Sequence, residues 1–251
     1  MDLVKPAPDS APARSLPGMG DHPTAISMVA GIMMALYRRE RTGKGGECAT
    51  NLMANGLWWN AIWTQAALCG AKVEARPPRE EADNPMHNLY CAADGRWFHL
   101  VMITKPDRFA EVCRAVGLDH LAEDPRFETI ESRKPHARVL IDAFDNVFRT
   151  KTWAEWKHIL TENRFTFGEI GTMEDIATDP QMRESGAIVP HPQPEKSGSG
   201  LTLSSPFWLT DTEKRPASMP PGLGEHNDDV LAELGFSESE AAALRDGGAF
   251  G

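Results

Sequence analysis

The aspartate at position 21 stands in a sequence setting that suits a reactive carboxylate. It lies in the stretch "GMGDHPTAISM", just before an apolar run that predicts a buried helix from about His22 to Arg41. Gly18 and Gly20 leave space for a ligand to approach the backbone. A carboxylate fixed at the start of such a helix can attack an activated acyl group and form a mixed anhydride. Backbone N–H groups nearby could stabilise the oxyanion that develops.

Helix capping explains the same residues and is favoured by the local pattern alone. Aspartate is among the preferred N-cap residues, and Pro23 suits the first turn of a helix. The helix dipole also stabilises a negative charge at this end. His22 has two interpretations too, as an acid or base in catalysis or as a local hydrogen-bonding residue. The local pattern therefore leaves both roles of Asp21 open.

Two further groups of residues could bind a ligand. Basic residues close the first helix and could neutralise phosphate groups, although they also suit a helix C-terminus: Arg38, Arg39, Arg41 and Lys44. A second group lies where a second domain is expected to begin, and such junctions often line clefts: Asn84, His87 and Tyr90. The spacing of the cysteines and histidines predicts no metal site.

The composition indicates a globular protein of the cytoplasm. The 251 residues include 41% hydrophobic and 25% charged residues, and the formal net charge is -10, which argues against non-specific nucleic-acid binding. The four cysteines are expected to be free thiols, most of them in the core. Residues 1 to 17 show no secretory signal, and the apolar run 25 to 36 is too short to span a membrane.

The pattern along the chain divides it into five regions. They are an extended lead-in (1–17), a first part of a large domain (18–70), a linker (71–88), a small α+β domain (89–189) and a tail that returns to the large domain (190–251).

Within these regions the sequence predicts specific elements. A strand is expected in "GGECATNLM", a second buried helix over 55–70, and a hairpin over 89–103 with its turn at Asp94-Gly95. Helices are expected over 105–116, 132–149 and 152–163, followed by a strand at "FGEI". Pairs with capping-box spacing predict the starts of three helices: Thr152 with Glu155, Thr172 with Asp175, and Ser237 with Glu240. The remaining expectations are a strand at "LTLSSPFWL" and a short helix at "NDDVLAELG".

Several motifs, taken in order, give the chain a family resemblance. These are "GDHPTA", "ALYRRERTGKG", "NPMHNLYCAADGRWFHLVMITKPDRFAEVCRAVG", "LAEDPRF", "TKTWAEW", "DIATDPQMRESGAIV" and "GEHNDDVLAELGFSESEAAAL". Together they resemble the class III CoA-transferases, the carnitine/bile-acid CoA-transferase family, over nearly the whole chain from Gly18 onward. The resemblance implies an α/β fold, with the C-terminal part of a Rossmann-like large domain and an inserted α+β small domain.

The resemblance also implies a function and a set of site residues. The family's catalytic nucleophile matches Asp21, so the expected activity is transfer of CoA from a thioester to a carboxylic acid through aspartyl anhydride and thioester intermediates. Coenzyme A would then be a substrate, no cofactor would be bound permanently, and the chain would form an interlocked homodimer. Candidate CoA contacts are Gly18, Gly20, His22, Arg38, Arg41 and Lys44, and candidate substrate contacts are Asn84, His87 and Tyr90.

The chain also differs from the family it resembles. Family members carry a nucleotide-binding half before the aspartate, whereas here Asp21 follows a short Pro-rich stretch, and no G-x-G-x-x-G or P-loop motif occurs. We therefore expect a truncated product, one subunit of a split enzyme whose partner is a separate N-terminal half, or a divergent copy. Two alternatives to a transferase are an acyl-CoA racemase of the same superfamily and a partner subunit without catalytic activity.

Overall fold

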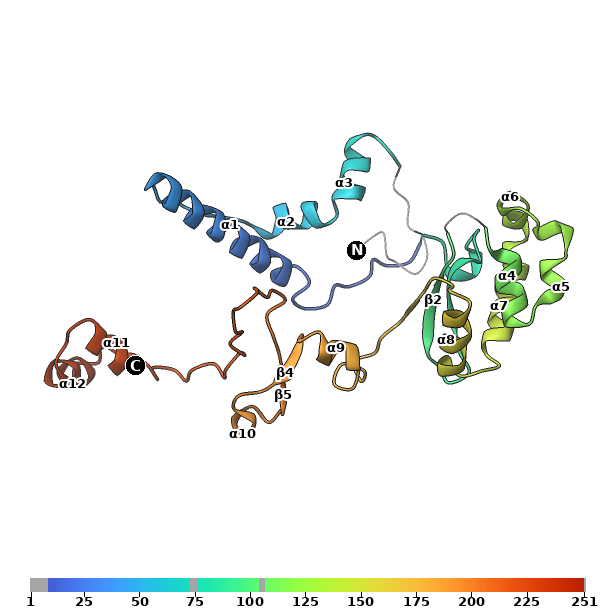
Figure 1. The fold of residues 1–251 in the computed structure, drawn as a ribbon. Coiled ribbons are helices and arrows are strands. Elements are labelled where there is room, and N and C mark those ends of the chain that lie inside the picture. Colours follow the sequence, from blue (N-terminus) through green and yellow to red (C-terminus); the bar gives the residue numbers. More distant parts are fainter. Residues whose placement is uncertain (1–8, 73–75, 104–106, 251) are drawn as a thin grey trace. The chain divides into compact units, whose positions relative to one another are not determined.

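The structure, a computed structural model, describes residues 9–72, 76–103 and 107–250. The chain forms two compact units, Met1–Ile170 and Gly171–Gly251, and each is described here by itself (Figure 1). Of the expected lead-in, residues 1–8 lie outside the described part, and residues 9–17 form no helix or strand.

The first unit begins with three helices, α1 (Asp21–Thr42), α2 (Leu52–Trp59) and α3 (Ala61–Leu68). The prediction of the first helix is confirmed, and it ends at Gly43, whose φ of 70° allows its N–H to donate to the Arg39 carbonyl. The second predicted helix is divided at Asn60 into α2 and α3. The predicted strand before it is wrong, because residues 44–51 have no strand to pair with and run as irregular chain.

The three helices expose the apolar side chains that the sequence assigned to a buried environment. No residue of α1 or α3 is buried, and α2 buries only Asn55. Exposed large apolar residues on these helices include Val29, Met33, Met34, Trp58, Trp59 and Ile62. The two helices that the sequence predicts to be buried are thus exposed in this unit, where no described element covers these side chains.

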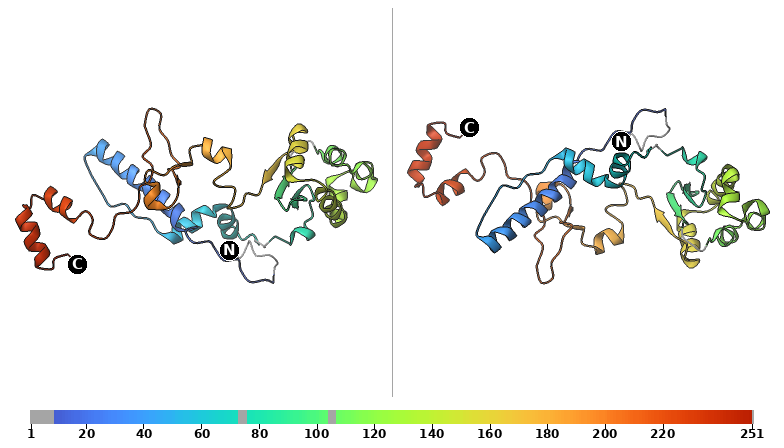
Figure 2. Two further views of the ribbon diagram at one scale, coloured as in Figure 1. Left: turned by 90° about the horizontal axis from the view of Figure 1, so that it is seen from below. Right: turned by 90° about the horizontal axis from the view of Figure 1, so that it is seen from above.

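A compact core forms in the later part of this unit. A three-stranded antiparallel sheet has the order β1 (His87–Cys91), β2 (Trp97–Val101) and β3 (Phe167–Glu169). The β1–β2 hairpin and the "FGEI" strand are thus confirmed. Helices lie to one side of the sheet in each view of Figures 1 and 2. They are α4 (Phe109–Val116), α5 (Asp119–Ala122), α6 (Ile130–Arg133), α7 (Ala137–Phe148) and α8 (Trp153–Glu162), with 3-10 turns at Arg79–Glu81, Pro125–Phe127 and Lys134–His136.

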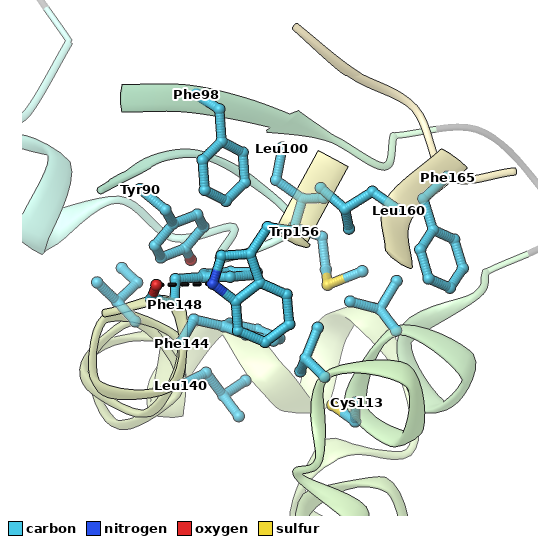
Figure 3. Packing of buried hydrophobic residues seen from close by; sticks show 14 of the residues in the cluster. Tyr90, Phe98, Leu100, Cys113, Leu140, Phe144, Phe148, Trp156, Leu160 and Phe165 are labelled. Atoms are coloured by element: carbon cyan, nitrogen blue, oxygen red, sulfur yellow. Dashed lines mark hydrogen bonds between the residues drawn. The ribbon is translucent and has the colours of Figure 1, made fainter. Parts of the chain in front are cut away.

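Aromatic side chains fill the space between the sheet and these helices. Tyr90, Phe98, Phe148 and Trp156 are fully buried, and the Trp156 indole donates a 2.7 Å hydrogen bond to the Phe148 carbonyl (Figure 3). The indole N–H is the one polar group of this large ring. Because it has a partner, the ring is buried without an unsatisfied hydrogen-bond donor.

The cysteines do not follow the sequence expectation. Only Cys113 is buried in this core, whereas Cys48 and Cys91 are half-buried and Cys69 is exposed. The prediction that most of them are core residues is wrong, since Cys48 and Cys69 belong to the segment whose apolar faces are uncovered.

The second unit has a two-stranded antiparallel sheet, β4 (Ile188–Pro190) and β5 (Leu201–Leu203), and four helices. These are α9 (Pro180–Glu184), α10 (Pro194–Ser197), α11 (Asn227–Glu233) and α12 (Glu238–Asp246). The helix expected to start at Thr172 is not formed. Asp175 accepts hydrogen bonds from the N–H and hydroxyl of Thr172 in a turn, and the next helix begins only after Asp179.

The described structure thus mixes helices with small sheets, as the sequence predicts for an α/β protein. None of the helices within the described ranges is long and apolar enough to cross a membrane.

Candidate active site

Asp21 is the first residue of α1, and Gly20 is its N-cap. The helix start is held by backbone hydrogen bonds from the His22 N–H to the Gly18 carbonyl (3.0 Å) and from the Thr24 N–H to the Gly20 carbonyl (3.2 Å). The Asp21 side chain is exposed and accepts no hydrogen bond from any residue that the structure describes. The carboxylate therefore does not cap the helix, although it lies in the first turn, where the helix dipole favours a negative charge.

The two glycines before Asp21 have different surroundings. Gly18 has a φ of +80°, and a Cβ built on it would lie 2.6 Å from the His22 ring, so only glycine fits there. A Cβ on Gly20 would lie 3.5 Å from Leu52 at the start of α2, which is an ordinary contact. The space predicted at Gly18 is thus filled by the His22 side chain, and Gly20 remains the more open of the two.

The basic candidates lie at the far end of the same helix. Arg38 and Arg41 belong to the exposed last turns of α1, and Lys44 follows its C-cap. At a rise of 1.5 Å per residue, Arg38 lies about 26 Å along the helix from Asp21. The structure therefore does not bring these residues together with the carboxylate of the same chain.

A separate hollow of about 610 Å³ lies beside the β1–β2 hairpin. It includes two of the three predicted pocket residues, Asn84 and His87, together with residues that the sequence analysis did not single out: Arg76, Arg79, Asn88 and His99. Asn84 accepts a 3.0 Å hydrogen bond from the Met86 N–H, which shapes the turn leading into β1.

Tyr90 lies in the core rather than in the hollow. It is fully buried, and its hydroxyl donates to the Pro85 carbonyl at 2.7 Å. Strand alternation separates it from His87, because residues three apart on a strand point to opposite faces. The same alternation could have revealed His99: in the register that pairs Leu89 with His99, His87 and His99 lie on one face of the hairpin.

Arg79 forms the most constrained part of the wall of the hollow. Its guanidinium makes a bidentate ion pair with Asp145, donates to the Leu89 carbonyl at 3.2 Å and lies over the Trp97 ring. Its Nε lies 3.2 Å from Glu80 Oε1, without the alignment of a hydrogen bond. Two carboxylates therefore lie against the Arg79 guanidinium. Arg79 connects α7, through Asp145, to the hairpin, through the Leu89 carbonyl.

The described residues contain no group of three or more His, Cys, Asp and Glu side chains placed to hold a metal ion. The polar groups described above are Asp21 and its neighbours in the helical segment, and the histidines and arginines beside the hairpin.

Comparison with known proteins identifies the family of the chain. Residues 1–227 match the family described as CoA-transferase family III. The chain belongs to this family. It is 24% identical over 237 residues to the (R)-2-hydroxy-4-methylpentanoate CoA-transferase of Clostridioides difficile. This alignment covers 94% of this chain and 59% of the relative. It is 27% identical over 255 residues to the formyl-CoA:oxalate CoA-transferase of Streptomyces coelicolor, over 96% of this chain and 62% of the relative.

The solved structures agree on the fold of this CoA-transferase family member. A CAIB/BAIF family protein from Brucella suis superposes with a TM-score of 0.75 at 22% identity, covering 93% of this chain and 60% of that chain. The α/β fold and the family resemblance expected from the sequence are thus confirmed. The chain spans less than two thirds of the length of these relatives.

Proposed function

We propose that this protein takes part in transferring coenzyme A from a CoA thioester to a carboxylic acid, with Asp21 as the nucleophile. The observation that carries the proposal is the Asp21 carboxylate, which is exposed and unpartnered at the first residue of α1 in a member of CoA-transferase family III. Relatives that act on CoA thioesters are consistent with this class of substrate.

The local geometry gives Asp21 the properties of a nucleophile. A carboxylate engaged in capping would have its oxygen lone pairs occupied by backbone N–H groups, whereas the Asp21 oxygens are free to attack. The adjacent Gly20 presents no side chain, and the first N–H groups of a helix have no partner within the helix. Those N–H groups could stabilise the negative charge that develops on an attacked carbonyl oxygen.

The proposed reaction consists of four balanced steps. An Asp21 oxygen attacks the thioester carbonyl carbon, the C–S bond breaks, and an aspartyl anhydride and CoA thiolate form. The thiolate attacks the aspartyl carbonyl carbon and releases the donor acid as its carboxylate. The acceptor carboxylate then attacks the resulting aspartyl thioester, giving a second anhydride and the thiolate. Attack of the thiolate on the acceptor acyl carbon yields the new CoA thioester and regenerates Asp21.

Trapping of the covalent intermediate tests the proposal. The 251-residue chain is assayed with acyl-CoA and a panel of carboxylates, alone and co-expressed with a polypeptide covering the part of the relatives that this chain does not span. Hydroxylamine added during turnover should convert Asp21 to a hydroxamate that peptide mass spectrometry detects. Asp21→Asn and Asp21→Ala should each lower the transfer rate by at least about a thousandfold.

A matched control separates this chemistry from a general effect of charge. Asp229 is also an exposed carboxylate in the first turn of a helix, so Asp229→Asn should leave the rate unchanged. Hydroxamate on another residue, or full activity of the Asp21→Asn protein, would contradict the assignment.

A further inference from the structure

The segment between α1 and α2 runs back along α1 toward Asp21 (Figure 1). Two close approaches fix its course. A Cβ built on Gly46 would lie 3.3 Å from Arg38 Nη1, near the end of α1. A Cβ built on Gly31, in the middle of α1, would lie 2.6 Å from the Cys48 sulfur. The segment therefore packs antiparallel to the helix and places the start of α2 at the end where Asp21 lies.

The Cys48 side chain packs closely against the middle of α1. Its thiol donates to the Met28 sulfur at 3.9 Å, and its sulfur occupies the space that a side chain at position 31 would fill. Glycine in the middle of a helix is unfavourable relative to alanine. The close approach of Cys48 gives Gly31 a structural reason.

The first turn of α2 is fixed by side-chain hydrogen bonds. Asn51 accepts a 2.8 Å hydrogen bond from the Ala54 N–H and caps the helix. Asn55, which is buried, donates to the Thr50 hydroxyl at 2.7 Å and to the Asn51 carbonyl at 2.8 Å. The backbone of Leu52 lies between these hydrogen bonds, so its side chain begins from a defined position.

The Leu52 side chain lies beside the residue that precedes Asp21. Its Cδ2 atom is 3.5 Å from the position of a Cβ on Gly20, so a leucine methyl group packs directly before the nucleophile proposed above. Leu52 is nevertheless 56% exposed. A group that becomes bonded to the Asp21 carboxylate therefore lies near open apolar surface. An apolar chain gains free energy by covering this surface, whereas a strongly polar group loses hydration there.

We propose that Leu52 is a specificity-determining residue, which contacts the carbon chain of the group that Asp21 attacks and favours apolar acyl groups over small polar ones. That this group is the acyl part of a CoA thioester rests on the proposed function, whereas the apolar contact beside the carboxylate does not.

Carbodiimide labelling of the full chain tests the contact without turnover. A carboxyl group adds across a C=N bond of a carbodiimide and rearranges to a stable N-acylurea, which peptide mass spectrometry locates. Apolar dicyclohexylcarbodiimide competes with water-soluble ethyl(dimethylaminopropyl)carbodiimide, and the ratio of the two adducts on Asp21 is measured. Leu52→Gln should lower this ratio by about fivefold, because the apolar reagent loses its contact. Leu52→Met should retain the ratio, because methionine restores an apolar side chain of similar size.

Leu57→Gln is the matched control for this labelling. Leu57 belongs to the same helix, is 54% exposed and lies about 140° further round the helix than Leu52. The variant removes a similar amount of exposed apolar surface, so the ratio on Asp21 should remain that of the wild type. An unchanged ratio in Leu52→Gln, an equal fall in Leu57→Gln, or an equal fall in Leu52→Met would each overturn the proposal.

Transfer assays keep this inference distinct from the proposed function. The chain is co-expressed with a polypeptide covering the part of the relatives that it does not span. Leu52→Gln should lower kcat/KM for hexanoyl-CoA relative to acetyl-CoA, while Asp21→Asn should remove transfer from both. An active Leu52→Gln protein with the wild-type preference would overturn the role of Leu52 and leave Asp21 as nucleophile. Absence of all transfer would contradict the proposed function, and the labelling ratio would still decide whether Leu52 makes the contact.

Discussion

At the scale of single residues, Asp21 differs from two aspartates in this chain that do cap helices. Asp124 accepts from the Arg126 N–H, and Asp179 accepts from two backbone N–H groups, so both cap their helices. In each of those cases proline follows immediately and takes the first helical position. In "DHP" the proline comes one residue later, and Asp21 itself becomes the first helical residue with no capping bond.

This difference could be predicted only in part from the sequence. The sequence located the helix start correctly, because the apolar run and Pro23 fix it to within one residue. It left capping and reactivity open, because both use the same residue type at nearly the same position. The spacing between aspartate and proline was the available signal.

The glycines before Asp21 permit a paired prediction. Gly18→Ala should disrupt the helix start, because its φ of +80° disfavours a side chain and the new Cβ would collide with the His22 ring. Gly20→Ala should be tolerated, because its Cβ would meet Leu52 at a normal distance. Hydrogen exchange of the His22 and Thr24 amides measures this directly, with loss of protection expected only for Gly18→Ala. Equal protection in both variants would contradict the structure of this loop.

At the scale of elements, short-range signals were more reliable than long-range ones, although the Thr172–Asp175 pair closes a turn and starts no helix. The capping boxes at Thr152 and Ser237 and the hairpin turn at Asp94-Gly95 were confirmed, because each depends on residues within a few positions of one another. The strand predicted in "GGECATNLM" failed because a strand needs a neighbour that local sequence does not specify. The apolar pattern of α1 indicates that the helix should be covered, but it does not say by what.

The capping box of α8 allows a quantitative prediction. Thr152 accepts from the Glu155 N–H, and Glu155 accepts from the N–H and hydroxyl of Thr152. Thr152→Ala should lower the free energy of unfolding by about 1 kcal/mol, while Thr152→Ser should retain most of it. Urea unfolding followed by tryptophan fluorescence, to which the buried Trp156 contributes, measures the difference. A loss as large for serine as for alanine would exclude the hydroxyl as the cause.

The same box should respond to acid in one direction. The hydrogen bonds from Thr152 hold the pKa of Glu155 below its usual range. A carboxylate whose pKa is lower in the folded state stabilises the fold above its unfolded pKa, and this contribution is lost as the pH falls through the lowered pKa. The Thr152→Ala and wild-type unfolding curves should therefore converge in acid.

At the scale of the whole molecule, apolar surface is distributed unequally along the chain. The core of the first unit lies within residues 86–165, where large aromatic and aliphatic side chains are fully buried. Helices α1 to α3 instead leave Trp58 and Ile62 about as accessible as they would be in an unfolded chain, at 78% and 81% exposure. Apolar surface of this extent on a folded chain commonly marks an interface with another polypeptide.

We therefore expect the isolated chain to self-associate through α1 to α3, as a homodimer or larger assembly. Trp58→Lys combined with Ile62→Lys should shift the sedimentation profile toward monomer. These substitutions should barely change the unfolding transition of the core, because neither side chain is buried. Val139→Lys, at an apolar residue of α7 that is 51% exposed, is the matched control and should leave the association unchanged.

High salt should strengthen the association, because hydrophobic contact drives it and screening reduces the repulsion between copies of net charge -10. A wild-type chain that sediments as a monomer at every salt concentration would show that these helices cover their apolar faces in some other way.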